Sequence, residues 1–313
     1  MTHKIILDTD PGIDDAMAIF FAFQAKEIDV LGLTTVYGNV PVEMAAQNAL
    51  TLVDLAGKDI PVCKGVARPW VGPESTYAHF VHGDDGFGNI NHPPSKRALD
   101  PRSSAQFIVD MAREYPGEIT LVAVGPLGNL ALALRLEPEL PKLIKAVNIM
   151  GGNAFVPGNV TPVAEANIWN DAHAAAIVFD ADWTVNMFGL DVTYDVPFSP
   201  QFIDTLADVN PTMGGFVAKA SQFYMEFYSQ GKEQQVCFFH DAYPLAYIMQ
   251  PSLFEMTPGH MRVGTGELDR GQTAFAPLNS TPSPLWLEAQ QANVATKVDH
   301  NSLTELFVST YAL

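Results

Sequence analysis

Short apolar runs alternate with longer segments of helical character through the first two hundred residues of the chain. The apolar runs predict strands at residues 5–7, 29–36, 60–64, 118–124, 146–150 and 184–191. The segments between them predict helices at residues 13–25, 41–56, 103–115 and 174–179, with a further helix that ends at residue 136. Because strands and helices alternate, right-handed crossovers and a parallel sheet are favoured. We therefore expect an α/β fold with a Rossmann-like, open, mostly parallel sheet and helices on both faces.

The pattern changes after residue 197. Helices are predicted at residues 202–206, 212–229, 240–249 and 302–312, and short strands at residues 261–263 and 294–298. We interpret this part as a helical C-terminal extension, so that residues 1–313 form a single domain. Residues 65–101 fit neither pattern, and a loop of that length inside a compact domain is usually functional or mobile.

The composition narrows the class of protein. At 313 residues and 34.0 kDa the chain is long enough to bury a large core. The net charge of −18 argues against nucleic acids and anionic membranes as partners, because both attract basic surfaces. Cys63 and Cys237 are the only cysteines, which is typical of a reducing compartment. We find neither a leader-like segment nor a membrane-spanning run, and we expect a cytoplasmic protein.

The densest group of acids lies in residues 5–16, where an apolar strand runs into a Pro-Gly turn and a helix. This stretch contains Asp8, Asp10, Asp14 and Asp15. Two like charges about 4 Å apart repel each other by roughly 4 kcal/mol at an effective dielectric of 20. No Lys or Arg lies between residues 4 and 26 to offset this repulsion, so we predict a bound cation. Oxygen ligands indicate calcium or magnesium, and carboxylates combined with carbonyls favour calcium. The alternative is that these acids only serve the helix start and a solvated turn.

Polar residues also follow the ends of several predicted strands. Asp10, Asn39, residues 124–125, residues 150–151 and Asp191 each stand at the carboxyl end of an apolar strand. In a parallel sheet these ends lie along one edge, where open α/β sheets bind ligands. Residues more than a hundred positions apart are therefore expected to converge on the acid-rich turn.

A Gly- and Pro-rich loop at residues 157–164 leads into a further polar pair. Glu165 and Asn167 are two residues apart, so in an extended segment their side chains face the same side. Such side chains are suited to binding vicinal hydroxyl groups. The alternative is an ordinary polar loop in which Asp171 caps the next helix.

Histidines and tyrosines supply further candidates, each with a structural alternative. His240 and Asp241 begin a predicted helix and could supply a proton donor and a metal ligand, or a buried histidine beside a helix-start acid. The position of His82 in the long loop favours a solvated histidine. Tyr224 and Tyr228 are four residues apart on a helix, a spacing found more often in a core than in a stacking surface.

Several short motifs occur along the chain in a particular order. The acid-rich turn, residues 8–16, is followed by matching runs at residues 34–40, 124–129, 149–152 and 158–162, by Glu165 with Asn167, and by His240 with Asp241. Together they span nearly the whole chain and resemble the inosine–uridine-preferring nucleoside hydrolases. The resemblance implies hydrolysis of ribonucleosides to free base and ribose, a calcium cofactor, a small-molecule ribonucleoside as partner, and assembly into a homo-oligomer (a dimer or a tetramer).

The resemblance also implies roles for individual residues. Calcium would be bound by Asp10, Asp15, the backbone carbonyl of Val124, and Asp241. Asp10 would activate a metal-bound water, and His240 matches a position thought to protonate the departing base. The ribose hydroxyls would be bound by Asp14, Asn39, Asn159, Glu165, Asn167 and the region of Met150. Tyr224 and Tyr228 match helix positions that close over the base in some members, and His82, also expected at the substrate, matches a histidine of the mobile loop.

The implied chemistry agrees with the residue types. Cleavage of an N-ribosidic bond develops positive charge on the sugar, as glycoside cleavage does. Carboxylates beside the sugar stabilise that charge, and calcium lowers the pKa of the attacking water. The absence of a Gly-rich phosphate loop with Lys agrees with a neutral nucleoside as substrate.

The chain departs from the family pattern at a few positions. Ala166 stands where the family usually carries Phe, which removes an aromatic wall near the ribose. Asn170 and Ala172 replace commoner residues, and residues 275–277 lack an expected acid. None of these changes removes an implied metal ligand, but they leave the preference for purine or pyrimidine bases unassigned.

Two alternative functions stay open at the level of sequence. A magnesium-dependent phosphatase of the haloacid dehalogenase type would use Asp8 and Asp10, but its downstream Lys and late acidic pair cannot be placed. A non-catalytic protein that binds nucleoside or calcium is the other alternative, because a fold does not determine function. Asp10 and His240 argue against a binding protein, and Ala166 keeps it open.

Overall fold

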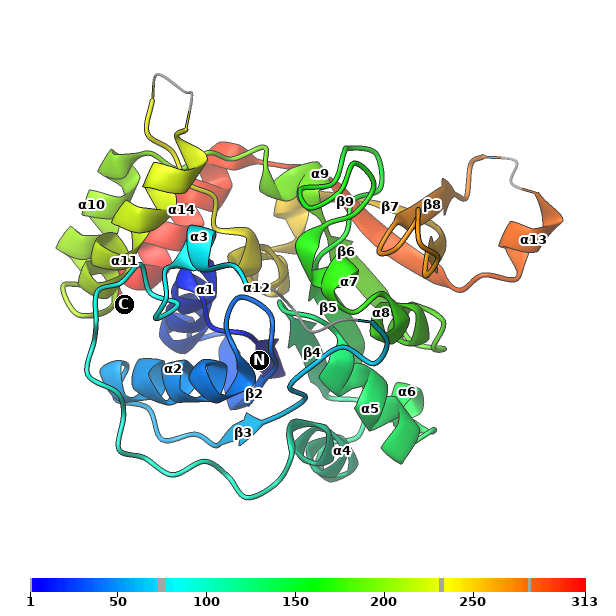
Figure 1. The fold of residues 1–313 in the computed structure, drawn as a ribbon, viewed down its shortest axis with the longest axis horizontal. Helices are drawn as coiled ribbons and strands as arrows, with labels where there is room; N and C mark the ends of the chain where they lie inside the picture. Colours follow the sequence, from blue (N-terminus) through cyan, green and yellow to red (C-terminus); the bar gives the residue numbers. More distant parts are fainter. Residues whose placement is uncertain (1, 73–76, 231–233, 281–282) are drawn as a thin grey trace.

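The computed structural model describes residues 2–72, 77–230, 234–280 and 283–313, and its strands form one nine-stranded sheet (Figure 1). The strand order is β3-β2-β1-β4-β5-β6-β9-β7-β8. Pairing is parallel from β3 to β9 and antiparallel on both sides of β7. The strands are β1 His3–Thr9, β2 Ile28–Thr35, β3 Val62–Lys64, β4 Ile119–Ala123, β5 Ala146–Met150, β6 Val185–Phe188, β7 Phe254–Val263, β8 Thr273–Pro277 and β9 Gln291–Val298. The prediction of a mostly parallel α/β sheet is confirmed.

Helices cover both faces of the sheet (Figure 1). They are α1 Ile13–Gln24, α2 Val42–Leu55, α3 His79–His82, α4 Ser104–Glu114, α5 Gly128–Leu136, α6 Leu140–Leu143, α7 Ala166–Asn170, α8 Ala172–Phe179, α9 Leu190–Thr193, α10 Pro200–Val209, α11 Met213–Tyr228, α12 Tyr243–Met249, α13 Pro284–Leu287 and α14 His300–Tyr311, with 3₁₀ turns at His240–Ala242 and Pro251–Leu253. Among the described residues, no helix is both long and apolar enough to cross a membrane.

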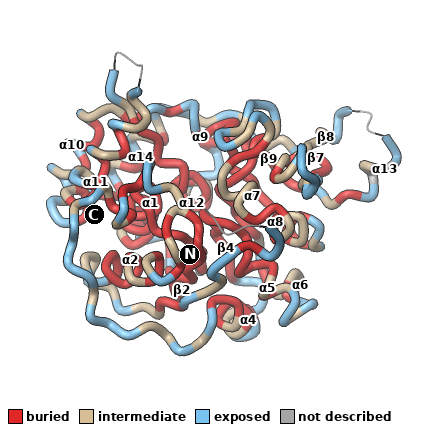
Figure 2. Tube along the Cα trace, viewed as in Figure 1, coloured by how far each residue is buried: buried red, intermediate tan, exposed pale blue. Residues whose placement is uncertain are grey.

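The core lies on the two faces of the sheet, and β1 shows why its sequence is a continuous apolar run. Ile5 and Leu7 belong to the hydrophobic cluster on one face, whereas Ile6 belongs to the cluster on the other. Both faces of a central parallel strand are buried, so residues 5–7 in the middle of β1 are all apolar. Helix α1 is buried along almost its whole length, in line with its apolar sequence (Figure 2).

The carboxyl-terminal part adds strands to the sheet as well as helices. β9 pairs with β6, and β7 and β8 form an antiparallel hairpin at the end of the sheet. Pro258 and Gly259 lie inside β7 and interrupt its apolar pattern, which explains why the sequence predicts only its last residues. β8 and the short helix α6 have no counterpart in the prediction.

Three local predictions are wrong. The strand expected at residues 184–191 ends at Phe188, because Gly189 is the N-cap of the short helix α9. The irregular stretch expected at residues 65–101 contains helix α3, while residues 73–76 lie outside the described part of the chain. The segment around Asn167, expected to be extended, forms helix α7.

Candidate active site

The turn between β1 and α1 is organised by Asp15, which binds the backbone of the residues before it. One carboxylate oxygen of Asp15 accepts hydrogen bonds from the hydroxyl of Thr9 and from the backbone N–H of Asp10. Its other oxygen accepts from the backbone N–H of Gly12 at 2.9 Å and from the side-chain amide of Asn39 at 3.0 Å. A carboxylate at this position is favoured by the amino end of helix α1. The acid-rich sequence therefore folds into a tight turn around its last carboxylate.

Asp10 lies at the end of β1 and is fully buried. Its Oδ2 accepts a hydrogen bond of 2.6 Å from the backbone N–H of Asn39, and its Oδ1 has no hydrogen-bond partner among the described residues. Two glycines make room for this carboxylate. A Cβ atom on Gly38 would lie 2.0 Å from Oδ2, and one on Gly125 would lie 2.4 Å from Oδ1. The strand ends of β2 and β4 therefore enclose the side chain of Asp10.

A third carboxylate, from a distant part of the chain, meets two adjacent acids of this turn. Single oxygens of Asp14, Asp15 and Asp241 all lie within 4.8 Å of one another. Burial, and next the charge of Asp15, raises the pKa of Asp14 to about 8, while burial followed by the charge of Asp14 raises the pKa of Asp241 well above its ordinary value. Asp14 Oδ1 has no hydrogen-bond partner among the described residues. A bound cation would relieve this repulsion and occupy the free oxygen, so the cluster fits a hard metal ion such as calcium.

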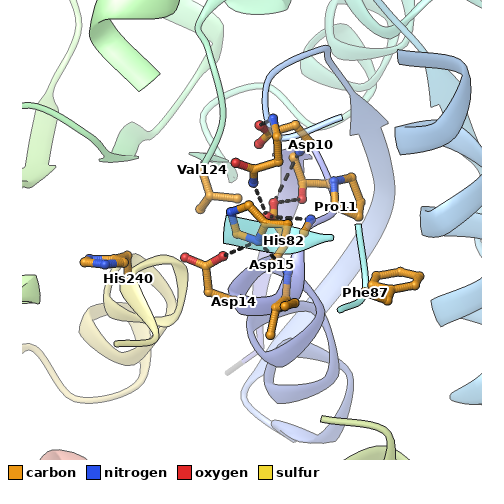
Figure 3. Close-up of polar contacts among 12 residues, drawn as sticks. Asp10, Pro11, Asp14, Asp15, His82, Phe87, Val124 and His240 are labelled. Atoms are coloured by element: carbon orange, nitrogen blue, oxygen red, sulfur yellow. Dashed lines mark hydrogen bonds and ion pairs between the residues drawn. The ribbon is translucent and has the colours of Figure 1, made fainter. Parts of the chain in front are cut away.

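Asp10 is not a member of this close cluster, although it is one of the implied metal ligands. It adjoins the cluster, since burial, and next the charge of Asp15, raises the pKa of Asp10 well above its ordinary value. Figure 3 shows Asp10 and Asp15 beside Val124, with the carboxylate of Asp14 directed toward the side on which His240 lies.

A cavity of about 270 Å³ opens over the acids at the carboxyl edge of the sheet. Of the candidate site residues named from the sequence, it is lined by Asp14, Asn39, His82, Val124, Met150, Asn159, Glu165, Asn167, Tyr224, Tyr228, His240 and Asp241, and two positions that depart from the family pattern, Ala166 and Asn170, line it too. Asp10 and Asp15 are buried beside it. Asp191, which was expected at the same edge, does not line the cavity; it accepts hydrogen bonds from the backbone N–H groups of Ala154 and Phe155.

Helix α7 forms one wall of this cavity. Glu165 is its N-cap, and the carboxylate accepts hydrogen bonds from the backbone N–H groups of Asn167 and Ile168. The side-chain amide of Asn167 donates to the backbone carbonyls of Val124 at 2.9 Å and Met150 at 3.2 Å. Glu165 and Asn167 thus both lie in the cavity wall. They are placed there by a capped helix, and not by the extended segment that the sequence suggested. Asp171 caps the next helix, as the alternative interpretation of this segment had it, because its side chain accepts a hydrogen bond from the N–H of Ala174.

His82 is buried, which contradicts its interpretation as a solvated loop residue. Its Nδ1 accepts a hydrogen bond of 3.2 Å from the backbone N–H of Ile13 at the start of α1. Its ring stacks on Tyr224, with ring centroids 5.4 Å apart. Burial, and next the charge of His240, lowers the pKa of His82 to about 3, so the imidazole is neutral at pH 7. His82 therefore joins the long loop to the acid-rich turn.

His240 is held between two hydroxyl groups on the other side of the cavity. Its Nδ1 lies 2.8 Å from Oγ1 of Thr193, and its Nε2 lies 3.1 Å from the hydroxyl of Tyr228. The rings of Tyr194 and Phe238 pack against the imidazole at centroid distances of 5.1 and 5.9 Å. Burial lowers the pKa of His240 to about 3. His240 is thus both buried and hydrogen-bonded, and it lines the cavity.

Several residues line the cavity that the sequence did not predict as site residues. They are Tyr77, Phe80, Val160, Trp169, Tyr194 and Phe227. Phe227 stands next to Tyr228 on α11, so the aromatic run of that helix is the signal that could have found it. The others come from loops and short helices, where no regular pattern marks the side that faces a ligand.

An open α/β sheet with an acid-lined cavity at its carboxyl edge is typical of an enzyme that acts on a small molecule. A sequence profile of the family described as inosine-uridine preferring nucleoside hydrolase matches residues 5–305. The chain is 40% identical over 314 residues to probable uridine nucleosidase 2 from Arabidopsis thaliana, covering 97% of this chain and 96% of that protein. It is 36% identical over 304 residues to the inosine-uridine preferring nucleoside hydrolase of Crithidia fasciculata, covering 96% and 94% of the two chains.

Solved structures show the same relationship. A plant nucleoside hydrolase superposes with a TM-score of 0.94 at 36% identity and covers 100% of this chain and 99% of its own. A purine-preferring ribonucleoside hydrolase from Gardnerella vaginalis gives a TM-score of 0.91 at 32% identity, with 99% and 98% covered. The chain therefore belongs to the inosine–uridine-preferring nucleoside hydrolase family, and it is a hydrolase that acts on the N-glycosyl bond of ribonucleosides.

Proposed function

We propose that this protein hydrolyses ribonucleosides to free base and ribose with calcium bound at the acid cluster. The observation that carries the proposal is the position of the buried carboxylates Asp14, Asp15 and Asp241 beside a cavity with a polar wall and an aromatic wall. The polar wall suits ribose hydroxyls, and the aromatic wall suits a planar base.

Calcium would be held by Asp10, Asp15, Asp241 and the backbone carbonyl of Val124. The unpartnered Oδ1 of Asp10 supports its place in this set, as does the all-oxygen character of the donors. Asp14 is assigned to the substrate, as the family resemblance implies, and it lines the cavity. When bound, calcium would lower the pKa of the attacking water and neutralise part of the clustered negative charge.

The side chains around the acid cluster then have three roles: proton transfer, stabilisation of charge on the ribose, and binding of its hydroxyl groups. Asp10 accepts a proton of the attacking water, and its Oδ2 is held in place by the N–H of Asn39. The carboxylate of Asp14 stabilises the positive charge that develops on the ribose. The ribose hydroxyls are bound by Asp14, Asn39, Asn159, Glu165, Asn167 and the Met150 segment. Oε2 of Glu165 already accepts from the backbone N–H groups of Gly152 and Ile168, whereas Oε1 accepts from that of Asn167 and keeps a second acceptor position for a hydroxyl.

The departing base is protonated from the side of His240. Burial keeps His240 neutral in the free protein, but negative charge that develops on the base favours the protonated imidazole and opposes the effect of burial. Tyr224, Tyr228 and His82 enclose the base. Tyr224 is almost fully buried and its ring contacts Tyr228 edge-on at 4.8 Å, so the three rings form a fixed aromatic surface.

The lining of the cavity favours a neutral substrate. None of the described lining residues is Lys or Arg, so a phosphate group would meet carboxylates without a compensating cation. This observation argues against the phosphatase alternative and against nucleotides as substrates. We further propose that residues 1–313 act as a single domain in the cytoplasm and that the protein assembles with copies of itself.

A reducing-sugar assay with inosine, uridine, cytidine and adenosine tests the proposed function. We expect ribose release from at least one nucleoside, loss of release after exhaustive chelation, and recovery with calcium. Asp10→Ala should abolish turnover at matched nucleoside affinity. Binding without turnover by the wild type would leave a non-catalytic nucleoside-binding protein as the better description, and undiminished release after chelation would contradict the metal assignment.

A further inference from the structure

The loop that joins β7 to β8 reaches the cavity wall through Arg270. The guanidinium group donates hydrogen bonds from Nε to the backbone carbonyl of Trp169 at 3.0 Å and from Nη2 to that of Asn170 at 3.2 Å. It also lies over the indole ring of Trp169, 5.0 Å from the ring centroid. Trp169 and Asn170 both line the cavity, whereas Arg270 does not. Arg270 thus contacts the cavity wall without lining the cavity itself.

This contact matters because helix α7 is too short to be stable by itself. It contains five residues, and short helices in water depend on contacts outside the helix. At its amino end the carboxylate of Glu165 accepts two backbone N–H groups. At its carboxyl end the last two carbonyls, which have no partner within the helix, are bound by Arg270. The helix that carries Asn167 is therefore held at both ends by side chains.

Gly271 shows that the loop and the helix are in close backbone contact. Its φ of +76° is favourable only for glycine, and a Cβ atom there would lie 2.6 Å from Cα of Trp169. The same hairpin also holds the preceding loop, because Oγ1 of Thr273 accepts from the N–H of Asn153 and donates to its carbonyl, both at 2.8 Å. The β7–β8 hairpin therefore supports the substrate-binding segment at more than one point.

We propose that Arg270 is a positioning residue that sets the place of Asn167 and Trp169 in the cavity through helix α7. The inference rests on the proposed function, because it assigns to α7 the binding of substrate. Two neighbouring carbonyls are reached by the planar fork of a guanidinium group, whereas the single ammonium of Lys presents no such fork and stacks less well on an indole ring. Arg270→Lys keeps the charge but should lose these contacts, so that helix α7 shifts from its place in the cavity wall.

The experiment compares two variants with two matched controls. Arg270→Lys and Gly271→Ala should each lower kcat/KM for a ribonucleoside by about tenfold to a hundredfold, since a displacement of about 1 Å can cost on the order of 10²-fold. Arg113→Lys is the control for arginine, because Arg113 pairs with Glu137 on the surface. Gly117→Ala is the control for glycine, because its φ of +75° matches that of Gly271 but its Cβ would meet nothing within 4 Å. Both controls should leave KM unchanged.

Two readouts separate positioning from a general loss of folded protein. A smaller folded fraction lowers the apparent kcat and leaves KM unchanged, whereas a displaced wall raises KM. In addition, Arg270→Lys should cost less in an Asn167→Ala background than in the wild type, because the part of its effect that acts through Asn167 is already lost there. An unchanged KM in Arg270→Lys, or losses that multiply in the double variant, would overturn the inference.

The wild type is measured first under the same conditions. A wild type that turns over no nucleoside contradicts the proposed function, whereas an active wild type with an unaffected Arg270→Lys contradicts only the role of Arg270. If Gly271→Ala does not fold, the conservative Arg270→Lys variant and its double-variant comparison decide the question.

Discussion

Oγ1 of Thr193 lies 2.8 Å from Nδ1 of His240, and both residues are buried. The opposite ring nitrogen lies 3.1 Å from the hydroxyl of Tyr228, so the imidazole is held on both edges. Thr193 does not line the cavity, although His240 and Tyr228 do. Thr193 therefore orients the histidine from behind without touching a ligand.

Removal of this hydroxyl should disturb the chemistry at His240. We expect Thr193→Val to lower kcat for a purine nucleoside by about tenfold, a fraction of the 10²–10⁴-fold that a general acid supplies. Steady-state kinetics on inosine checks this. Thr51→Val is the control, because Thr51 is also buried and hydrogen-bonded but lies on α2 away from the cavity. Equal losses in the two variants would mean that Thr193 acts only on stability.

The proposed role of His240 can be tested by the choice of leaving group. His240→Ala should slow cleavage of a purine nucleoside by about 10²-fold or more, because the departing base needs a proton. Cleavage of p-nitrophenyl riboside should be nearly unaffected, since its leaving group needs none. Parallel assays of both substrates provide the measurement, and equal losses on both would remove His240 from the role of acid.

Gly38 and Gly125 should be intolerant of a methyl group. A Cβ on either residue would come closer than 3 Å to the carboxylate of Asp10, which is enclosed on both sides. We expect Gly38→Ala and Gly125→Ala to weaken calcium binding and to lower kcat/KM by about 10²-fold, on the scale of a 1 Å displacement. Gly215→Ala is the control, because nothing lies within 4 Å of its Cβ and alanine favours a helix. Calcium titration of the chelated variants, followed by tryptophan fluorescence, tests this; full calcium affinity in Gly38→Ala would contradict it.

Asp10 and Asp14, which both lie close to Asp15, should differ in function. Asp10→Asn should weaken calcium binding by at least about tenfold, since breaking a charge-assisted interaction costs about 1.5–3 kcal/mol. Asp14→Asn should leave calcium affinity closer to that of the wild type and raise KM, because Asp14 lines the cavity. Isothermal titration with calcium and steady-state kinetics measure the two effects. The reverse pattern would place Asp14 among the metal ligands, in agreement with its close approach to Asp15 and Asp241.

The stability of the metal-free protein should fall as pH rises. Burial and neighbouring carboxylates raise the pKa of Asp14 to about 8 and that of Asp10 and Asp241 well above the ordinary value. Between about pH 4, where carboxyl groups of the unfolded chain titrate, and about pH 8, the folded state binds more protons than the unfolded state. These carboxyl groups therefore lower the free energy of unfolding of the chelated protein across this range. The lowered pKa values of His82 and His240 oppose this effect below about pH 6.5, so the decrease is clearest between about pH 6.5 and 8.

Calcium should reverse this trend, because it binds the deprotonated carboxylates. We expect the Tm difference between the calcium-loaded and the chelated protein to be larger at pH 8 than at pH 5 by at least about 2–4 °C, the shift that about 1 kcal/mol produces in a large domain. Calorimetry at the two pH values, with and without chelator, is the measurement. A Tm difference that does not change with pH would contradict the raised pKa values of Asp10, Asp14 and Asp241 in the metal-free protein.

Much of the fold follows from the sequence because its signals are local. The apolar runs of β1, β2, β4 and β5 lie in the predicted places, since strands buried on both faces favour apolar residues at every position. The short helices α3, α7 and α9 do not follow from local pattern. Each has four or five residues, too few for a helical period to appear, and the two ends of α7 are bound by side chains that lie outside the helix, Glu165 and Arg270.

The sequence by itself determined the family, the acid-rich turn and the convergence of polar residues at the carboxyl edge of the sheet. Parallel strand order alone places those strand ends together, so no side-chain detail was needed. Only the tertiary structure decided that His82 caps the start of α1, that Thr193 holds His240, and that Arg270 supports Trp169. The contact between Arg270 and Trp169 joins residues 101 positions apart. A local pattern reports which residues are buried or polar, but the partner of a buried donor depends on which distant segment packs against it.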